Sequence, residues 1–264
     1  MGTVPRGKVQ GVRPGTSGRI QSVERAFAVL EAMVDAGGAI SLTDLSDAVR
    51  LPLPTIHRLL RTFVELGYVR QEPSRQYVLG PGLIRLGETS SLALGTWARP
   101  HLARLVDELG ESANLAMLEG DRVVYVGQVP SRHSMRMFTE VGRQVPAHCT
   151  AVGKAMLARE SADQVRTLLD RAGMLAQTEH TITTPDAMFE ELDRVRRDGY
   201  AMDNGEQEVG VRCVGVAVPE APFRVAMSVS GPATRISDAF VQRAVPQLLR
   251  AAADLSRDLR RAHA

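Results

Sequence analysis

Cysteine, lysine and aromatic residues are scarce in this chain of 264 residues, and long hydrophobic runs are missing. Two cysteines, Cys149 and Cys213, cannot build the disulfide framework of a small secreted domain. No stretch approaches the roughly 20 apolar residues that span a bilayer. The N-terminus also lacks the apolar core of about 7–15 residues that a signal peptide needs. We therefore expect a cytoplasmic protein without membrane association.

The composition that remains is that of a globular chain, with 44% hydrophobic and 23% charged residues. Its length suits two domains of about 100–200 residues each. Residues 1–90 contain eleven basic and eight acidic residues, so their net charge is +3. Residues 91–264 contain twenty-one basic and twenty-two acidic residues, so their net charge is −1. This positive excess at the front is too modest to identify a partner by itself.

The first segment, residues 1–19, contains five glycines and two prolines. It cannot bury enough apolar surface to offset its ordering entropy, so we expect a disordered basic arm. Order begins at residue 20, where the spacing predicts a helix with Ser22 as its N-cap. The residues expected on the buried face of this helix are Val23, Ala26, Phe27 and Leu30.

Two shorter helices and a hairpin follow. Ser41 precedes Asp44 by three residues, which indicates the start of a helix that ends before Pro52. Pro54 suits the first turn of the next helix, which runs to Phe63. A turn at residues 72–75 then separates two strand-like segments. Three helices and a hairpin in this order predict a winged helix-turn-helix domain over residues 20–80.

The third helix of such a domain, which is the second helix of its helix-turn-helix motif, enters the major groove of DNA, so its outward side chains are candidate base contacts. Arginine pairs with guanine through two hydrogen bonds, threonine meets a thymine methyl group, and histidine donates to a base or a phosphate. An ordinary solvated helix face remains the alternative for any one of these residues. The candidate DNA-binding residues are Thr55, His57, Arg58 and Arg61 on the helix and Arg70 and Arg75 on the hairpin.

Residues 81–98 have helical spacing and are interpreted as a linker helix that ends before Pro100. From residue 99 to 264 the pattern predicts an α+β domain, a sheet with helices packed on it. Pro246 predicts a kink or break in the last helix, residues 241–261. The strands are expected at residues 113–118, 123–126, 135–138, 215–218 and 225–230, and the other helices at 153–158, 162–169 and 187–198.

Several residues of this second domain have chemistry that suits a small ligand. Residues 146–158 lead from a loop into a helix, whose N-terminal N–H groups favour an anion. Ser228 and Ser230 share one face of a strand and could hold a carboxylate or a carbonyl. Cys213, on a strand, could also contact a ligand; the alternative is that it serves only as a small buried hydrophobic side chain.

Metal binding or cysteine catalysis would need His148, Cys149 and Cys213 to meet. Neither ligand spacing nor a third catalytic partner supports such a site. The chain also lacks a P-loop and a dinucleotide fingerprint. We therefore expect no catalytic residue, no metal and no cofactor, and we predict that the protein is not an enzyme.

Several runs in the first domain resemble the DNA-binding domain of IclR-type transcriptional regulators. They are Ile20 to Ala26, Leu51-Pro52, His57 to Leu60 and Gly67 to Val69. Pro54 departs from the small hydroxylic residue that such helices usually carry there. The resemblance extends to about residue 260 and implies a GAF-like effector-binding domain over residues 99–264.

The likeness is strongest to members that control allantoin and glyoxylate use, through Met135-Arg136-Met137, Gly153-Lys154-Ala155, Gly210 to Cys213 and Ser230-Gly231-Pro232. In those members the ligand is a small oxo-acid, and a Gly-Ala pair stands where this chain has Ala151-Val152. The effector-binding residues that the resemblance implies are Met137, Val145, Ala151, Val152, Asp203, Val211, Cys213, Ser228 and Ser230.

The resemblance implies a repressor of allantoin- or glyoxylate-related catabolic genes, released by glyoxylate, allantoate or allantoin. Its expected partner is a pseudo-palindromic operator in double-stranded DNA, bound by a homodimer or a dimer of dimers. An IclR-type regulator that responds to another small carboxylate or an aromatic acid is one alternative. A redox sensor that uses Cys149 or Cys213 is another.

Overall fold

The computed structural model describes residues 20–95, 97–137 and 139–263. The expected basic arm, residues 1–19, lies outside them. The chain divides into two compact units between Ser90 and Ser91. Among the described residues, no helix combines the length and the hydropathy needed to cross a membrane.

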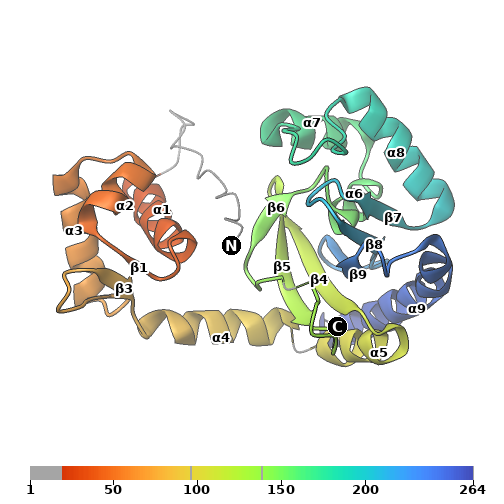
Figure 1. Ribbon diagram of the computed structural model, residues 1–264, viewed down its shortest axis with the longest axis horizontal. Coiled ribbons are helices and arrows are strands. Elements are labelled where there is room, and N and C mark those ends of the chain that lie inside the picture. Colours follow the sequence, from red (N-terminus) through yellow and green to blue (C-terminus); the bar gives the residue numbers. More distant parts are fainter. Residues whose placement is uncertain (1–19, 96, 138, 264) are drawn as a thin grey trace. The chain divides into compact units, whose positions relative to one another are not determined.

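The first unit has the winged helix-turn-helix order that the sequence predicts (Figure 1). Strand β3 lies between β1 and β2 and is antiparallel to both. The three helices and the sheet enclose one apolar core that includes Met33, Leu45, Ile56 and Leu60. The elements are α1 (Gln21–Asp35), β1 (Ala39–Ile40), α2 (Leu42–Val49), α3 (Leu53–Glu65), β2 (Val69–Gln71) and β3 (Tyr77–Leu79).

Helix α1 buries a face that overlaps the predicted one only in part, since Leu30 packs against the core but Val23 and Phe27 are exposed. Its fully buried residues are Val29, Ala32 and Met33, whereas Phe27 is 60% exposed. Ser22 lies inside the helix, and the N-cap is Ile20, which makes no side-chain capping bond. The apolar stripe of α1 is wider than the contact that one small core offers, so the outer part of the stripe faces solvent.

The start of α2 agrees with the sequence, because Ser41 caps it by accepting a hydrogen bond from the backbone N–H of Asp44 at 3.2 Å. Helix α3 begins one residue before Pro54, which therefore occupies the first turn. Helix α4 (Gly82–Gly95) crosses the division between the two units.

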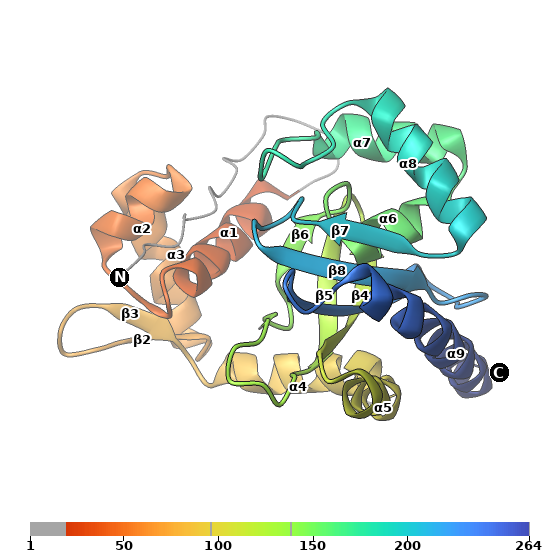
Figure 2. The same ribbon diagram turned by 45° about the vertical axis from the view of Figure 1, so that its right-hand side comes forward.

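The second unit is an α+β domain around a six-stranded antiparallel sheet of order β6-β5-β4-β9-β8-β7. Helices cover both faces of this sheet (Figure 2). The elements are α5 (Arg99–Leu109), β4 (Ser112–Glu119), β5 (Arg122–Val129), β6 (Gln144–Pro146), α6 (Ala151–Leu157), α7 (Ala162–Ala172), α8 (Pro185–Asp198), β7 (Ala201–Asn204), β8 (Val211–Ala217), β9 (Val225–Pro232) and α9 (Asp238–His263).

The two faces of the sheet have separate apolar cores. Leu115 and Val214 point toward α5 and α9, where Leu105 and Leu248 are fully buried. On the opposite face Ala116 and Ala226 pack with residues of α6, α7 and α8. Alternate residues of each strand therefore serve different layers.

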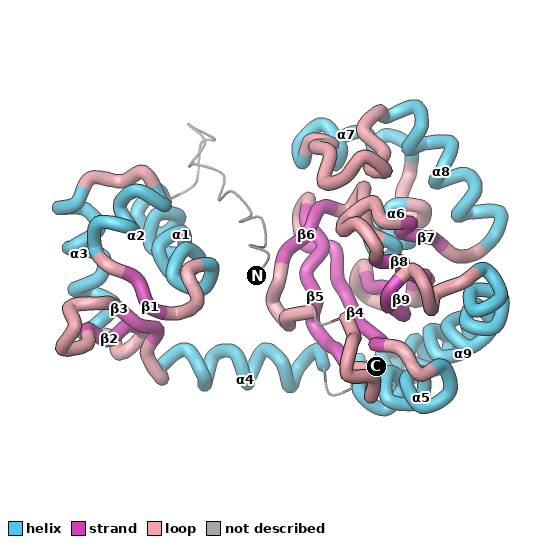
Figure 3. Tube along the Cα trace, viewed as in Figure 1, coloured by secondary structure: helices cyan, strands magenta, loops and turns pink. Residues whose placement is uncertain are grey.

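One predicted strand of this domain is wrong. Residues 135–137 form bends and loop instead of a strand, while Phe138 lies outside the described residues (Figure 3). The strand near that place is β6, which pairs with β5. Of the kink or break predicted at Pro246, the break is absent: α9 is one continuous helix through the proline, and its buried residues on both sides pack against the sheet.

Candidate DNA-binding surface and effector site

The candidate base-contacting residues lie on the outer side of α3. His57, Arg58 and Arg61 are exposed, and Thr55 is half-buried in the first turn. Ile56 and Leu60 point the opposite way and are fully buried, which fixes the rotation of the helix about its axis. Arg61 is engaged by Glu65 one turn later, with Nε donating to Oε1 at 3.0 Å. Arg58 therefore has the freer guanidinium of the two.

The hairpin between β2 and β3 carries the two remaining candidates. Arg70 is exposed on β2, and Arg75 is exposed in the turn. The N–H of Arg75 donates to the carbonyl of Glu72 at 2.9 Å, which closes the predicted turn. Arg75 has a φ of 64°, the left-handed conformation that closes this turn. Both side chains are long enough to reach phosphates beside a groove.

The second unit aligns the predicted effector residues by strand register. Asp203 on β7 pairs with Cys213 on β8, Cys213 with Ser230 on β9, and Ser230 with Ser112 on β4. Paired residues share one face of a sheet. A neighbouring row contains Gly215, Ser228, Asn114 and Gln128. We call these two rows the polar face of the sheet.

The polar face is buried and hydrogen bonded internally. The side-chain amide of Asn114 lies 3.0 Å from Oγ of Ser230 and 3.4 Å from Oγ of Ser228. Asn114 is 1% exposed and the two serines are 2–4% exposed. Ser112 donates from Oγ to the carbonyl of Met137 at 2.8 Å, which holds the Met137 loop beside this face.

Helix α6 covers the polar face at Gly215. A Cβ atom at that glycine would lie 2.9 Å from the backbone carbon of Ala151 and 3.1 Å from the nitrogen of Val152, closer than real Cβ contacts. The helix begins at Thr150, whose Oγ1 accepts a hydrogen bond from Gly153 N at 3.2 Å. Only glycine at position 215 lets this helix end approach the sheet so closely.

The apolar residues of the predicted site lie on α6, on two strands and in a loop. Val152 packs in one buried cluster with Val145 of β6. Val211 is 8% exposed and precedes Cys213 on the same face of β8. Met137 is half-buried in its loop. Asp203, Val211, Cys213, Ser228 and Ser230 therefore share one face of the sheet, and Ala151 and Val152 begin α6 above Gly215. Val145 lies on the edge strand β6, and Met137 lies in the loop that Ser112 holds.

Asp203 has the most perturbed carboxylate on this face. Its Oδ1 accepts hydrogen bonds from the backbone N–H of Glu206 at 2.8 Å and of Gln207 at 3.4 Å. Burial raises the pKa of Asp203 to about 7, and the negative charge of Glu206 adds to that increase. Near neutral pH this group therefore exchanges a proton readily.

The two thiols are poor nucleophiles. Burial, and then the charges of Asp203 and Glu206, raise the pKa of Cys149 to about 12. The thiol of Cys149 instead donates to Oε1 of Gln207 at 2.9 Å. Burial also raises the pKa of Cys213 well above its usual value. A reactive cysteine needs a thiolate, and this environment opposes one.

Lys154 of α6 is buried and paired with two carboxylates. Its Nζ donates to Glu206 at 2.5 Å and lies 2.9 Å from Glu191 of α8. Glu191 is in turn bound by Arg194 at 2.7 Å. These ion pairs tie α6 to α8 and to the loop after β7. Within the described part of the chain, no group of three or more His, Cys, Asp or Glu residues is placed to hold a metal.

Sequence reasoning missed Asn114, Gln128 and Glu206. Asn114 interrupts the apolar run of β4, which is a detectable signal because a buried amide needs partners. Gln128 and Glu206 have no such signal, because their roles depend on strand pairing and on the position of Lys154.

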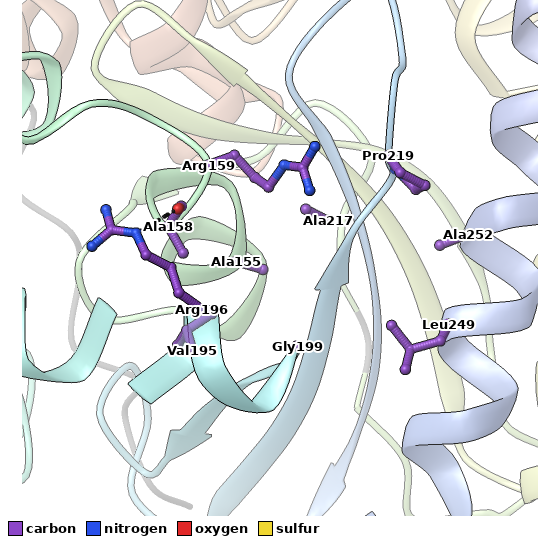
Figure 4. A pocket seen from close by; sticks show the side chains of 10 residues that line it. All are labelled: Ala155, Ala158, Arg159, Val195, Arg196, Gly199, Ala217, Pro219, Leu249 and Ala252. Atoms are coloured by element: carbon purple, nitrogen blue, oxygen red, sulfur yellow. Dashed lines mark hydrogen bonds between the residues drawn. The ribbon is translucent and has the colours of Figure 1, made fainter. Parts of the chain in front are cut away.

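Two cavities lie away from the polar face. A cavity of about 510 Å³ is lined mainly by small and apolar side chains, together with Arg159 and Arg196 (Figure 4). Arg196 is already bound to the carbonyl of Ala158 at 2.9 Å and to Asp193 at 2.6 Å. A second hollow of about 400 Å³ lies beside α7. None of the predicted effector residues lines either of them.

Comparison with known proteins gives a consistent result for the whole chain. Residues 22–73 match the IclR helix-turn-helix domain, and residues 87–257 match the bacterial transcriptional regulator IclR C-terminal domain.

Two relatives come from Escherichia coli K12. The transcriptional repressor IclR is 34% identical over 91% of this chain and 90% of its own length. The HTH-type transcriptional regulator KdgR is 35% identical over 90% of this chain and 92% of its own length. An IclR transcriptional regulator from Alicyclobacillus acidocaldarius has a similar crystal structure, with a TM-score of 0.79 and 31% identity over 90% of this chain and 98% of that one.

Proposed function

Because the chain belongs to the IclR family of bacterial transcriptional regulators, we propose that it represses allantoin- or glyoxylate-related catabolic genes. The family consists of ligand-responsive DNA-binding regulators, which confirms the expectation that the chain is not an enzyme. The proposed effector is a small oxo-acid or ureide such as glyoxylate, allantoate or allantoin. The observation that carries this proposal is the alignment of Asp203, Cys213, Ser228 and Ser230 on one buried face beneath α6.

This site suits a small polar ligand. The polar face offers two hydroxyls, one thiol and a carboxyl group that is readily protonated. Apolar side chains of Val145, Val152 and Val211 border it and would exclude water around the ligand. Such a mixture favours compact molecules with several polar atoms.

Operator binding is proposed to use two copies of the first unit. A two-fold dimer would present two α3 helices about 34 Å apart, one turn of DNA, which suits a pseudo-palindromic operator. The outer face of α1 supports this pairing. Its exposed apolar residues are Ile20, Val23, Phe27 and Val34. Leu30 is half-buried and also packs against the core of the first unit, and it completes the alternating three- and four-residue spacing of a coiled-coil seam.

The dimer proposal is tested by Phe27→Glu, which places a charge in the middle of that row. We expect this variant to sediment as a smaller species and to bind operator DNA more weakly, with little change in its melting temperature. Leu175→Glu, at an exposed position of the second unit, is the control. An unchanged sedimentation coefficient for Phe27→Glu would exclude this face as the interface.

A regulator that responds to another small carboxylate or an aromatic acid remains the second candidate. The relatives of similar identity carry different regulator names, so similarity alone does not select an effector. A redox sensor is disfavoured by the raised pKa values of Cys149 and Cys213.

The deciding experiment measures binding of the protein to promoter DNA upstream of its own and neighbouring genes, at a fixed salt concentration, with and without each proposed effector. Specific binding that is released by glyoxylate, allantoate or allantoin would support the proposal and name the effector. Specific binding that none of them releases would leave a regulator and reject the allantoin and glyoxylate assignment.

A further inference from the structure

A chain of side-chain amides crosses the sheet and ends at the two serines of the polar face. Gln128 on β5 is paired in register with Asn114 on β4, and Asn114 with Ser228 on β9. At the outer end of this chain, Gln128 lies against the backbone of Thr139, in the loop that follows Met137. The order is therefore Thr139, Gln128, Asn114 and the two serines.

The backbone of Thr139 fixes the orientation of the Gln128 amide. One end of that amide is 2.8 Å from the nitrogen of Thr139 and the other is 3.2 Å from its carbonyl oxygen. A backbone N–H only donates, and a carbonyl only accepts. The oxygen of Gln128 must therefore lie on the N–H, and its NH₂ group must donate to the carbonyl.

This orientation fixes the next amide in turn. The same oxygen of Gln128 lies 3.0 Å from one end of the Asn114 side chain. That end must be the NH₂ group, because two facing oxygens would repel each other. The oxygen of Asn114 then occupies the other end, 3.0 Å from Oγ of Ser230 and 3.4 Å from Oγ of Ser228. There it accepts the hydroxyl hydrogens of both serines.

We infer that Asn114 and Gln128 are specificity-determining residues that make Ser228 and Ser230 acceptors toward the ligand. With their hydrogens directed to Asn114, the serine oxygens offer lone pairs. A ligand that places an N–H or O–H group there gains a hydrogen bond, as a ureide or a hydroxy acid does. An oxo-acid presents an oxygen to an oxygen and must first break a serine–asparagine bond.

This inference rests on the proposed function, since it assumes that the polar face is the effector site. Among the proposed effectors it favours the ureides, which carry several N–H groups. It disfavours the bare carbonyl of an oxo-acid at this position.

The test compares ligands of equal charge and nearly equal size on the full-length protein. Lactate and pyruvate differ in whether the second carbon carries a hydroxyl or a carbonyl group, and mandelate and benzoylformate differ in the same way. We expect calorimetric titration to give a Kd about tenfold lower for the hydroxy acid of a pair, the effect of one well-made hydrogen bond. Allantoate is titrated beside them as the ureide.

The variant Gln128→Met removes the amide that connects Thr139 to Asn114 while keeping a side chain of similar length. Asn114 is then free to turn over, so the preference for the hydroxy acid should fall to about twofold or less. Gln144→Met, at an exposed position of the neighbouring strand β6, is the matched control and should keep the wild-type ratio.

A wild-type preference for the oxo-acids, or an unchanged ratio in a folded Gln128→Met protein, would overturn the inference. The ratio of the two Kd values in the wild-type protein tests the inference even if Gln128→Met does not fold. Release of operator DNA by oxo-acids but not by donor-bearing ligands would reject this inference alone. Failure of every ligand, allantoate included, to bind would reject the effector site as well.

Discussion

Asp203 is the residue whose chemistry has the most direct measurable consequence. Because burial raises its pKa to about 7, the carboxyl group is largely neutral below that pH and charged above it. An anionic effector would meet a second negative charge at higher pH. We therefore expect the affinity for such an effector to fall as the pH rises from about 6 to about 8, by up to about tenfold per unit above the pKa.

The matched variant is Asp203→Asn, which cannot ionise. Its effector affinity, followed by calorimetry over the same pH range, should be nearly constant. Glu206 and Lys154 remain in place in that variant, so a persistent pH dependence would assign the titration to them or to the ligand.

Gly215 makes a second prediction at the residue scale. Gly215→Ala would push the start of α6 away from the sheet, because its methyl group meets backbone atoms of Ala151 and Val152. We expect a loss of about 1–3 kcal/mol in the free energy of unfolding and a weaker effector response. Chemical denaturation and effector titration measure the two effects.

The control for Gly215 is Gly87→Ala in α4, where a Cβ would meet nothing within 4 Å. That change should be neutral or slightly stabilising because alanine favours helix. If Gly215→Ala were equally neutral, the close approach of α6 would not matter for folding.

At the scale of elements, α3 carries the proposed base contacts, so substitutions on its outer face test the proposed DNA interface. Arg58 is exposed and Arg61 is partly engaged by Glu65. Arg58→Ala should therefore weaken operator binding by about 1–3 kcal/mol, with a smaller effect for Arg61→Ala. Fluorescence anisotropy with labelled operator DNA measures both. Equal affinities for Arg58→Ala and the wild type would remove Arg58 from the interface.

The elements that the sequence predicted well are those fixed by neighbours along the chain. Ser41 caps α2 through a residue three positions later, and the turn before Arg75 closes by a local hydrogen bond. The buried face of α1 was predicted only in part because its stripe has two apolar sides, and only the fold selects which side is covered. Strands β6 and β7 were missed because three or four residues carry little pattern, and pairing partners define them.

The site followed the same rule. The serines of β9 could be predicted to share a face because strands alternate. Their alignment with Asp203 and Cys213 depends on the register of three strands, which the sequence pattern does not reveal. These four residues were grouped into one site only through the resemblance to the family. Asn114 and Gln128 depend on both register and the loop at Thr139, so only the structure reveals them.

At the scale of the whole molecule, ligand binding must alter DNA affinity through a free-energy coupling, typically about 1–3 kcal/mol. Ser230→Ala removes one proposed ligand contact in the second unit and leaves the first unit untouched. We expect normal operator affinity without effector and at least a fivefold higher effector concentration for half-release. Titration of the protein–DNA complex with effector provides both numbers. A wild-type release curve would argue against Ser230 as a ligand contact.

The alternation along β4 and β9 has one more consequence. Asn114, Ser228 and Ser230 lie on the face proposed to bind the ligand, while Ala113, Leu115, Met227 and Val229 belong to the opposite apolar core. Substitutions at every second position can thus change what the domain senses without disturbing what holds it together. A sheet of this kind lets chemical selectivity diverge between related proteins while the scaffold is inherited intact.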